Sequence, residues 1–183
     1  YLVEEDNAMI WRGPMVSSAL QQLLNETAWQ ECDYLIIDLP PGTGDIQLTM
    51  AQKIPISGAV VVTTPQDIAL LDAKKAYRMF EKVEVPVLGI VENMAYFTPK
   101  CHHHEAIFGE GGAQNMAQAF NVPLLAKLPL VKQVRMQGDS GMPIVVAAPD
   151  SEIAKPYWAM AYEVAAKLAL REVDYTAVTL EII

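Results

Sequence analysis

Two polar residues in the sequence each follow an apolar run, and their chemistry suits a nucleotide site. Asp38 ends the run Tyr-Leu-Ile-Ile at residues 34–37, and Asn93 ends a second run at residues 85–93. A carboxylate can hold Mg²⁺ or its water beside a phosphate, and a carboxamide can pair with the edge of adenine. The alternative is structural: Asp38 would cap the next helix, and Asn93 would end its strand in a turn.

The turn after Asp38 is stiff and carries two glycines, because residues 40–44 read Pro-Pro-Gly-Thr-Gly. The prolines fix φ, and Gly42 and Gly44 let the backbone approach a bound group closely. This turn is too short to cradle a phosphate, which takes a row of backbone N–H groups and a lysine. No G-x-x-x-x-G-K-[ST] sequence occurs in the 183 residues. We therefore expect the phosphate-binding loop of a nucleotide hydrolase to precede Tyr1.

A second concentration of reactive side chains lies at residues 101–105, which read Cys-His-His-His-Glu. Thiolate and imidazole are ligands for zinc, iron or an iron–sulfur cluster. Cys101, His102 and His103 are therefore candidate metal ligands, and a solvated polar loop is the alternative. One cysteine cannot hold a four-cysteine cluster, and a symmetric dimer would bring only two. Histidines would have to complete such a site.

The pattern of apolar residues predicts which elements position these groups. Continuous apolar runs predict strands at residues 34–38, 58–63, 85–93 and 122–128. Helical spacing predicts helices at residues 14–25, 46–53, 68–81, from 111 or 112 to about 120, and from 150 or 151 to about 168. Strands that alternate with helices predict an α/β fold with a mostly parallel central sheet flanked by helices.

Two smaller features carry structural expectations. Trp158 and Tyr162 share one face of the last helix, and we expect them to dock that helix on the sheet. Gly109-Glu110-Gly111-Gly112 opens a helix and could cradle an anion at its N-terminus. The negative charge of Glu110 opposes that use, so a mobile joint between loop and helix is the preferred interpretation.

Composition narrows the class of protein. The chain has 183 residues and 52% hydrophobic residues, which suits a single domain over residues 1–183. Its net charge of −9 disfavours nucleic acid and anionic membrane as partners. Two distant cysteines are no disulfide framework and fit the reducing cytoplasm. No apolar run approaches the roughly 20 residues of a membrane span, and no signal peptide is visible.

Five motifs occur in a fixed order along the chain. They are W-R-G-P-M (11–15), D-Y-L-I-I-D-L-P-P-G-T-G-D (33–45), T-P-Q-D (64–67), G-I-V-E-N-M (89–94) and I-F-G-x-G-G (107–112). Together they closely resemble the Mrp/ApbC family of iron–sulfur cluster carrier ATPases, which are deviant Walker A P-loop NTPases related to MinD and ParA. The resemblance runs from about residue 11 to about residue 169.

The resemblance implies a homodimer that binds ATP with Mg²⁺ and carries a [4Fe–4S] cluster bridged between subunits for transfer to recipient apoproteins. By position, Asp38 corresponds to the catalytic Walker B aspartate that acts on Mg²⁺ or its water. Gly42 to Gly44 correspond to the switch II turn that senses the γ-phosphate, and Asn93 corresponds to the asparagine that contacts adenine. The segment after Pro129 corresponds to the loop that closes over the base.

The sequence departs from the family pattern at two places. The family's P-loop, with its signature lysine, and its switch I aspartate would precede Tyr1. The family's C-x-x-C pair is incomplete, because Cys101 stands at its second position and Thr98 at its first. The leading hypothesis is an ATP-dependent iron–sulfur cluster carrier. The alternatives are a MinD/ParA-like nucleotide switch and a metal-binding adaptor that uses Cys101 and the histidines 102–104.

Overall fold

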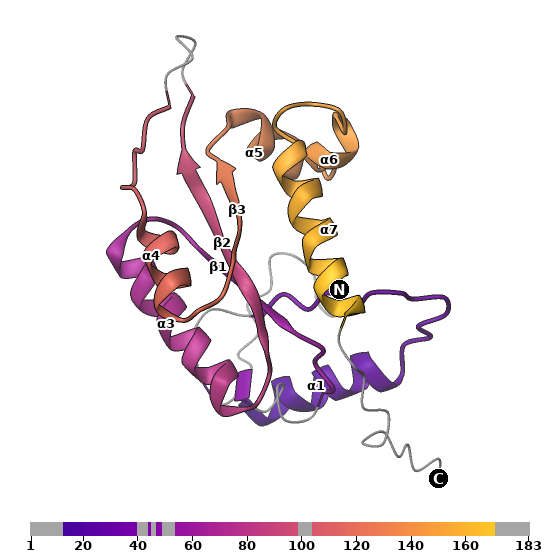
Figure 1. Cartoon of the computed structure of the whole chain (residues 1–183). Coiled ribbons are helices and arrows are strands. Elements are labelled where there is room, and N and C mark those ends of the chain that lie inside the picture. The colour runs from indigo at the N-terminus through magenta and orange to yellow at the C-terminus, as the bar shows by residue number, and fades with distance from the viewer. Residues whose placement is uncertain (1–12, 40–43, 45–46, 49–53, 99–103, 171–183) are drawn as a thin grey trace.

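The fold is built on a small parallel sheet, seen in the computed structural model of the chain (Figure 1). The structure describes residues 13–39, 44, 47–48, 54–98 and 104–170. Its three strands are β1 (Ala59–Thr63), β2 (Val87–Tyr96) and β3 (Leu124–Pro129), in the order β1-β2-β3. Both strand pairs are parallel. This confirms the predicted α/β class and three of the four predicted strands.

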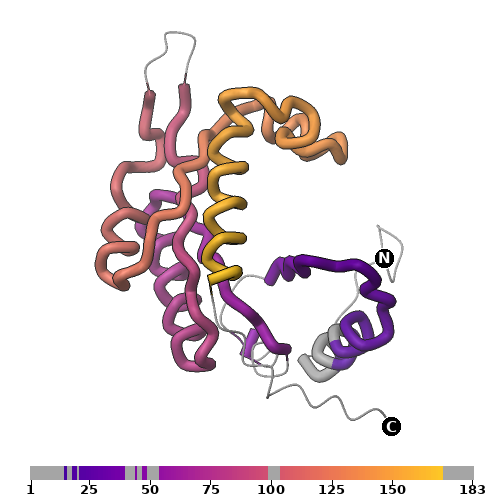
Figure 2. The backbone as a smooth tube through the Cα atoms, turned by 45° about the vertical axis from the view of Figure 1, so that its right-hand side comes forward, coloured from indigo at the N-terminus to yellow at the C-terminus, as the bar shows by residue number. Residues whose placement is uncertain are grey.

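Helices cover the two faces of this sheet. α3 (Asp67–Lys82) connects β1 to β2, and α4 (Gly112–Ala119) connects β2 to β3. Both lie on one face, while α7 (Lys155–Ala169) lies on the other, as the rotated view shows (Figure 2). Two short helices, α5 (Lys132–Asp139) and α6 (Ile144–Ala147), fill the connection from β3 to α7. Helices on both faces explain why the strand sequences are continuously apolar.

Neighbouring residues of the central strand belong to two different cores. Ile90 is fully buried in the core formed with α3 and α4. Val91, its neighbour, is buried at 1% exposure in the core beneath α7, together with Leu125 and Leu128. Side chains alternate between the faces of a strand, so β2 needs an apolar residue at every position between the two layers.

The predicted strand at residues 34–38 is wrong. These residues form no strand, and Tyr34, Leu35 and Ile36 are 59%, 46% and 90% exposed. An apolar run becomes a buried strand only where a neighbouring strand and covering helices accept it. Among the described residues the sheet ends at β1, with no strand on its outer side. The stretch reaches the core only at Leu39, which packs against the α3–α4 side.

The predicted docking of the last helix through Trp158 and Tyr162 is also wrong. These two rings stack on each other on the outside of α7, where they are 40% and 70% exposed. Tyr157, Met160 and Val164 pack on the sheet instead. Positions 157, 160 and 164 share one helical face, and the face with positions 158 and 162 lies about 150° further round the helix. Because α7 is rich in alanine and has apolar residues on several sides, its sequence does not show which face is buried.

Of the other predicted elements, the first helix is confirmed, and several fall on residues that the structure does not describe. α1 (Gly13–Asn25) confirms the first predicted helix, and it lies away from the three strands (Figure 2). Of the predicted helix at residues 46–53, only Gln47 and Leu48 are described, and both are helical. Gly42, residues 99–103 and the tail beyond residue 170 lie outside the described residues. In the described part of the chain, no helix has the length and apolar character that crossing a bilayer would require.

Candidate functional site

The carboxyl edge of the sheet carries a row of polar residues. Thr63, the last residue of β1, pairs with Glu92 in β2, and Glu92 pairs in turn with Lys127 in β3. Asn93 is the next residue of the central strand; β2 continues past it to Tyr96, so Asn93 does not end the strand as predicted. In open α/β sheets this edge is where ligands bind. The structure therefore places one of the predicted nucleotide residues, Asn93, where such a site would be.

The side chain of Asn93 is held by its own backbone neighbour. Its Oδ1 accepts a hydrogen bond from the backbone N–H of Met94 at 2.9 Å, and the side chain is half-buried. Met94 has φ 55°, a left-handed conformation that is uncommon for a residue with a long side chain. With the carbonyl oxygen engaged, the amino group of the carboxamide is left to donate to a ligand.

Asp38 and Gly44 are placed differently from the prediction. Asp38 is exposed in the unpaired stretch before residue 40 and does not stand at the end of a strand. Gly44 is also exposed, and its carbonyl accepts a hydrogen bond from Leu48 at 3.3 Å. Gly42 lies outside the described residues. The structure thus does not bring the predicted acidic residue to the edge where Asn93 lies.

Glu92 is a residue that the sequence analysis missed. It is 2% exposed, and its Oε2 accepts a hydrogen bond from the backbone N–H of Ala113 at 3.0 Å, in the first turn of α4. Backbone N–H groups at a helix N-terminus favour a negative charge. The sequence does carry a signal for this residue, because Glu92 is the one charged residue within the apolar run 85–93.

Gly111 and Gly112 stand where the loop meets α4, and the predicted mobility of this joint stays a prediction. Gly111 adopts φ 77°, and a Cβ on Gly112 would lie 2.5 Å from Leu70 Cδ1 and 2.9 Å from the Pro65 carbonyl oxygen. Glycine is required for both reasons, conformation at the first position and space at the second. The N–H of Ala113 at this helix N-terminus already donates to the carboxyl group of Glu92, so the joint does not present it to an external anion.

Beyond Asn93, β2 continues into the stem of a hairpin that carries the Cys–His sequence. The backbones of Phe97 and Glu105 exchange two hydrogen bonds of 2.8 Å, and the Tyr96 carbonyl accepts one from Leu130 at 2.7 Å. Cys101, His102 and His103 lie outside the described residues. Within the described ranges, no three His, Cys, Asp or Glu residues are grouped to hold a metal ion.

The two described side chains furthest out on this stem, Thr98 and His104, are in contact. Thr98 Oγ1 lies 2.9 Å from His104 Nδ1, and the ring of His104 meets that of Tyr96 edge-on at 4.6 Å. Burial raises the pKa of Tyr157 on α7, and the nearby Tyr96 raises it further. Tyr157 therefore stays protonated at neutral pH.

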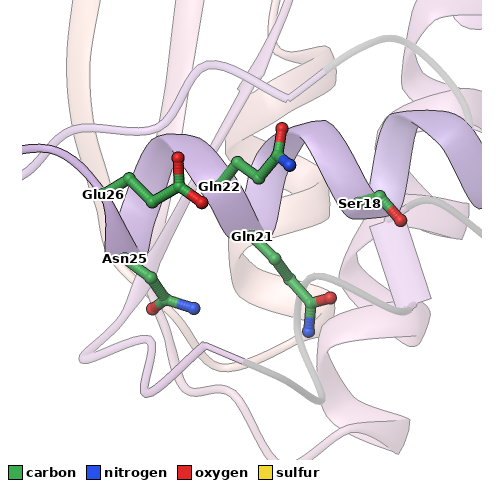
Figure 3. Close-up of a pocket in the computed structure, with 5 residues that line it drawn as sticks. All are labelled: Ser18, Gln21, Gln22, Asn25 and Glu26. Atoms are coloured by element: carbon green, nitrogen blue, oxygen red, sulfur yellow. The ribbon is translucent and has the colours of Figure 1, made fainter.

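A separate hollow lies along α1, far from these residues in sequence. It is lined by five polar side chains, all from α1 or the turn that follows it: Ser18, Gln21, Gln22, Asn25 and Glu26 (Figure 3). Known small-molecule sites are lined mostly by apolar side chains with a few polar ones. This hollow lacks apolar walls and contains none of the predicted site residues, so it is not a candidate site.

A parallel sheet with helices on both faces and polar residues along its carboxyl edge is found in P-loop NTPases, among other open α/β folds. A nucleotide-binding protein from Archaeoglobus fulgidus, solved with ADP and cobalt, superposes with a TM-score of 0.66 at 38% identity, covering 76% of this chain and 56% of that one. The cell-division ATPase MinD of Pyrococcus furiosus superposes with a TM-score of 0.58 at 23% identity, covering 85% of this chain and 59% of that one, and shows the shared fold.

The sequence identifies the family within that class. Residues 1–165 match the ParA family of NUBPL iron-transfer P-loop NTPases, and the chain belongs to this family. The iron-sulfur cluster carrier protein of Haemophilus influenzae is 60% identical over 169 residues, covering 92% of this chain and 46% of that protein. The mouse iron-sulfur cluster transfer protein NUBPL is 51% identical over 169 residues, covering 92% of this chain and 53% of that protein. The chain spans about half the length of these relatives.

Proposed function

We propose that this protein is an iron–sulfur cluster carrier that uses ATP and passes its cluster to recipient apoproteins. The observation that carries the proposal is the family match over residues 1–165, which contains both the predicted nucleotide residues and the Cys–His sequence. Relatives named as iron-sulfur cluster carriers are 60% identical to this chain. Identity at this level over 169 residues supports a shared activity.

In the nucleotide site, Asn93 would bind adenine with the amino group of its carboxamide. Asp38 would be the catalytic carboxylate that holds Mg²⁺ or its water, and Gly42 and Gly44 would form the turn that senses the γ-phosphate. Bound ATP supplies the phosphoanhydride whose hydrolysis drives the cycle. Asp38 can reach that edge only if residues 34–38 join the sheet beside β1, because they now lie exposed outside it.

In the cargo site, Cys101, His102 and His103 would hold iron. A homodimer would bring two such sets together around one [4Fe–4S] cluster, and release to an apoprotein would complete the transfer. With two cysteines and no disulfide framework, we place this activity in the reducing cytoplasm and treat residues 1–183 as one domain.

The test is reconstitution of the purified protein with iron and sulfide without oxygen. We expect an absorption band from sulfur-to-iron charge transfer that disappears in Cys101→Ala, and we expect the wild-type band to fall as an added apoprotein gains a cluster. Cys32→Ala is the matched control, because Cys32 is the other cysteine and is exposed. A band that survives Cys101→Ala, or no band in the wild type, would reject the carrier function.

A second candidate is a metal-binding adaptor without cluster transfer. It is favoured by Thr98, which stands where the family resemblance places a cysteine ligand. Elemental analysis separates the two functions. Zinc without sulfide after purification would favour the adaptor, and iron with sulfide in equal amounts would favour the carrier.

A further inference from the structure

The central strand β2 carries a bulge between the sheet and the stem of the Cys–His hairpin. Glu92 pairs with Lys127 of β3, and the next pair is Tyr96 with Pro129. Between these two pairs β2 advances four residues while β3 advances two, so β2 holds two extra residues here. The last pair of β2 with β1 is also at Glu92. Bulges of this kind are frequent beside active sites, where they re-aim a side chain.

Asn93 and Met94 form the turn of this bulge. Met94 has φ 55°, and a left-handed conformation persists at a residue with a long side chain only where its surroundings hold it. The preceding residue supplies such a hold, because Asn93 Oδ1 accepts the Met94 N–H at 2.9 Å. Asparagine suits this bond, since its short carboxamide reaches a neighbouring backbone group. A side-chain hydrogen bond therefore braces the irregular point of the strand.

The stem of the hairpin begins directly after this bulge and rises beyond the sheet (Figure 1). The Tyr96 carbonyl accepts the Leu130 N–H at 2.7 Å, and Phe97 and Glu105 exchange two backbone hydrogen bonds of 2.8 Å. The returning arm reaches Gly109, whose φ of 97° is a conformation that glycine adopts without steric cost. Because glycine imposes little on the returning arm, the direction of the stem is set by the bulge in the outgoing arm.

The carboxamide of Asn93 has a second polar group besides its oxygen. The oxygen is engaged by the Met94 N–H, and the amino group still carries two N–H donors. A ligand whose acceptor meets the amino group in this orientation binds the braced bulge more tightly than an opened one. A ligand that prefers one of two conformations raises the population of that conformation. Occupancy of the amino group therefore favours the braced bulge.

We infer that Asn93 is a positioning residue that couples the carboxyl edge of the sheet to the hairpin stem. Its bond to Met94 holds the bulge, and a ligand on the amino group of the same side chain holds the bulge more firmly and so orders the stem. The brace needs no ligand, whereas the choice of an adenine nucleotide as that ligand rests on the proposed function.

Residue-resolved hydrogen exchange of the nucleotide-free protein tests the brace. Loss of a typical hydrogen bond shifts a local opening equilibrium about 2- to 10-fold. We therefore expect Asn93→Ala to speed exchange at the amides of Phe97 and Glu105 by this factor. Asn93→Asp keeps an acceptor oxygen for the Met94 N–H, so its stem amides should exchange at the wild-type rates.

Two controls confine the effect to the stem. The amide of Ile90, which donates to the Pro123 carbonyl at 2.9 Å, lies in β2 before the bulge and should keep its rate in every variant. Asn115→Ala makes the same change at an exposed position of α4 and should leave the stem unaltered. Wild-type stem rates in Asn93→Ala would overturn the brace. Equal acceleration in Asn93→Asp, or at Ile90, would overturn it too, since the effect would then not come from a local acceptor.

Saturating Mg²⁺-ATP tests the coupling, with binding measured separately by equilibrium dialysis. In the wild type we expect bound nucleotide to slow exchange at Phe97 and Glu105 by about 2- to 10-fold, as one more hydrogen bond supports the brace. Asn93→Asp has lost the amino donor, so its stem rates should not respond to nucleotide.

Nucleotide that binds without slowing the stem in the wild type would overturn the coupling, and a response that persists in Asn93→Asp would do the same. Failure of ATP to bind would reject an adenine nucleotide as the ligand, and with it the nucleotide part of the proposed function. The rates of the nucleotide-free variants would still decide whether Asn93 braces the bulge.

Discussion

At the scale of single residues, two side chains of β2 accept hydrogen bonds from main-chain N–H groups. Glu92 holds the first turn of α4, and Asn93 holds the N–H of Met94 at 2.9 Å. One residue thus positions a helix and the next presents a polar group at the sheet edge. The sequence analysis singled out Asn93 because an amide after a strand suits a base. It passed over Glu92, since the partner of a buried carboxylate lies 21 residues away and is a main-chain group.

Substitution of Glu92 should reveal this role in stability. Glu92→Ala leaves the buried N–H of Ala113 without a partner, and such a group costs about 1–3 kcal/mol. Glu92→Gln retains an acceptor but loses the charge at the helix N-terminus, for which we expect about 0.3–1 kcal/mol. Urea unfolding followed by circular dichroism measures both free energies of unfolding. Equal losses in the two variants would contradict a hydrogen bond to α4 as the main role of this side chain.

At the scale of elements, the joint between the hairpin and α4 is closely packed. A methyl group on Gly112 would meet Leu70 and the Pro65 carbonyl oxygen, so Gly112→Ala should destabilise the fold by about 1–3 kcal/mol. Gly138, in the last turn of α5, has open space where its Cβ would be. Gly138→Ala should therefore stabilise by about 0.5–1 kcal/mol through helix propensity. Thermal unfolding of the two variants compares them, and a stabilising effect of Gly112→Ala would show that the joint yields.

The elements also show which predictions a sequence supports. The runs at residues 58–63, 85–93 and 122–128 became strands because each finds its neighbours and its covering helices within the described chain. The run at residues 34–37 is also continuously apolar or aromatic, but a strand needs partners that composition does not specify. The last helix was predicted correctly and its buried face was not, because Ala-rich helices have apolar residues on several sides. Trp158 and Tyr162 were predicted to dock the helix because they share a face, whereas Tyr157 is the aromatic residue packed on the sheet.

At the scale of the whole molecule, two apolar segments lack a covering layer among the described residues. Among the described residues, no strand pairs with the outer edge of β1, where Val62 is 60% exposed. The second segment is the exposed stretch 34–36, which leads to Leu39, and Leu39 packs against the core that β1 shares with α3 and α4. An unpaired edge is a ready template for another strand. If Asp38 acts on a bound nucleotide, the stretch must add to this edge, since only then does Asp38 reach the carboxyl side of the sheet.

Hydrogen exchange with and without nucleotide tests this rearrangement. With saturating Mg²⁺-ATP, we expect the amides of residues 34–38 and of β1 to exchange more slowly, because new strand pairing engages them. The amides of α7 serve as the internal control, since that helix packs on β3 at the other edge and should not change. Binding is measured independently by equilibrium dialysis. If nucleotide binds while residues 34–38 keep exchanging at the free rate, Asp38 does not join the site, and the catalytic role proposed for it fails even though the adenine contact of Asn93 would remain.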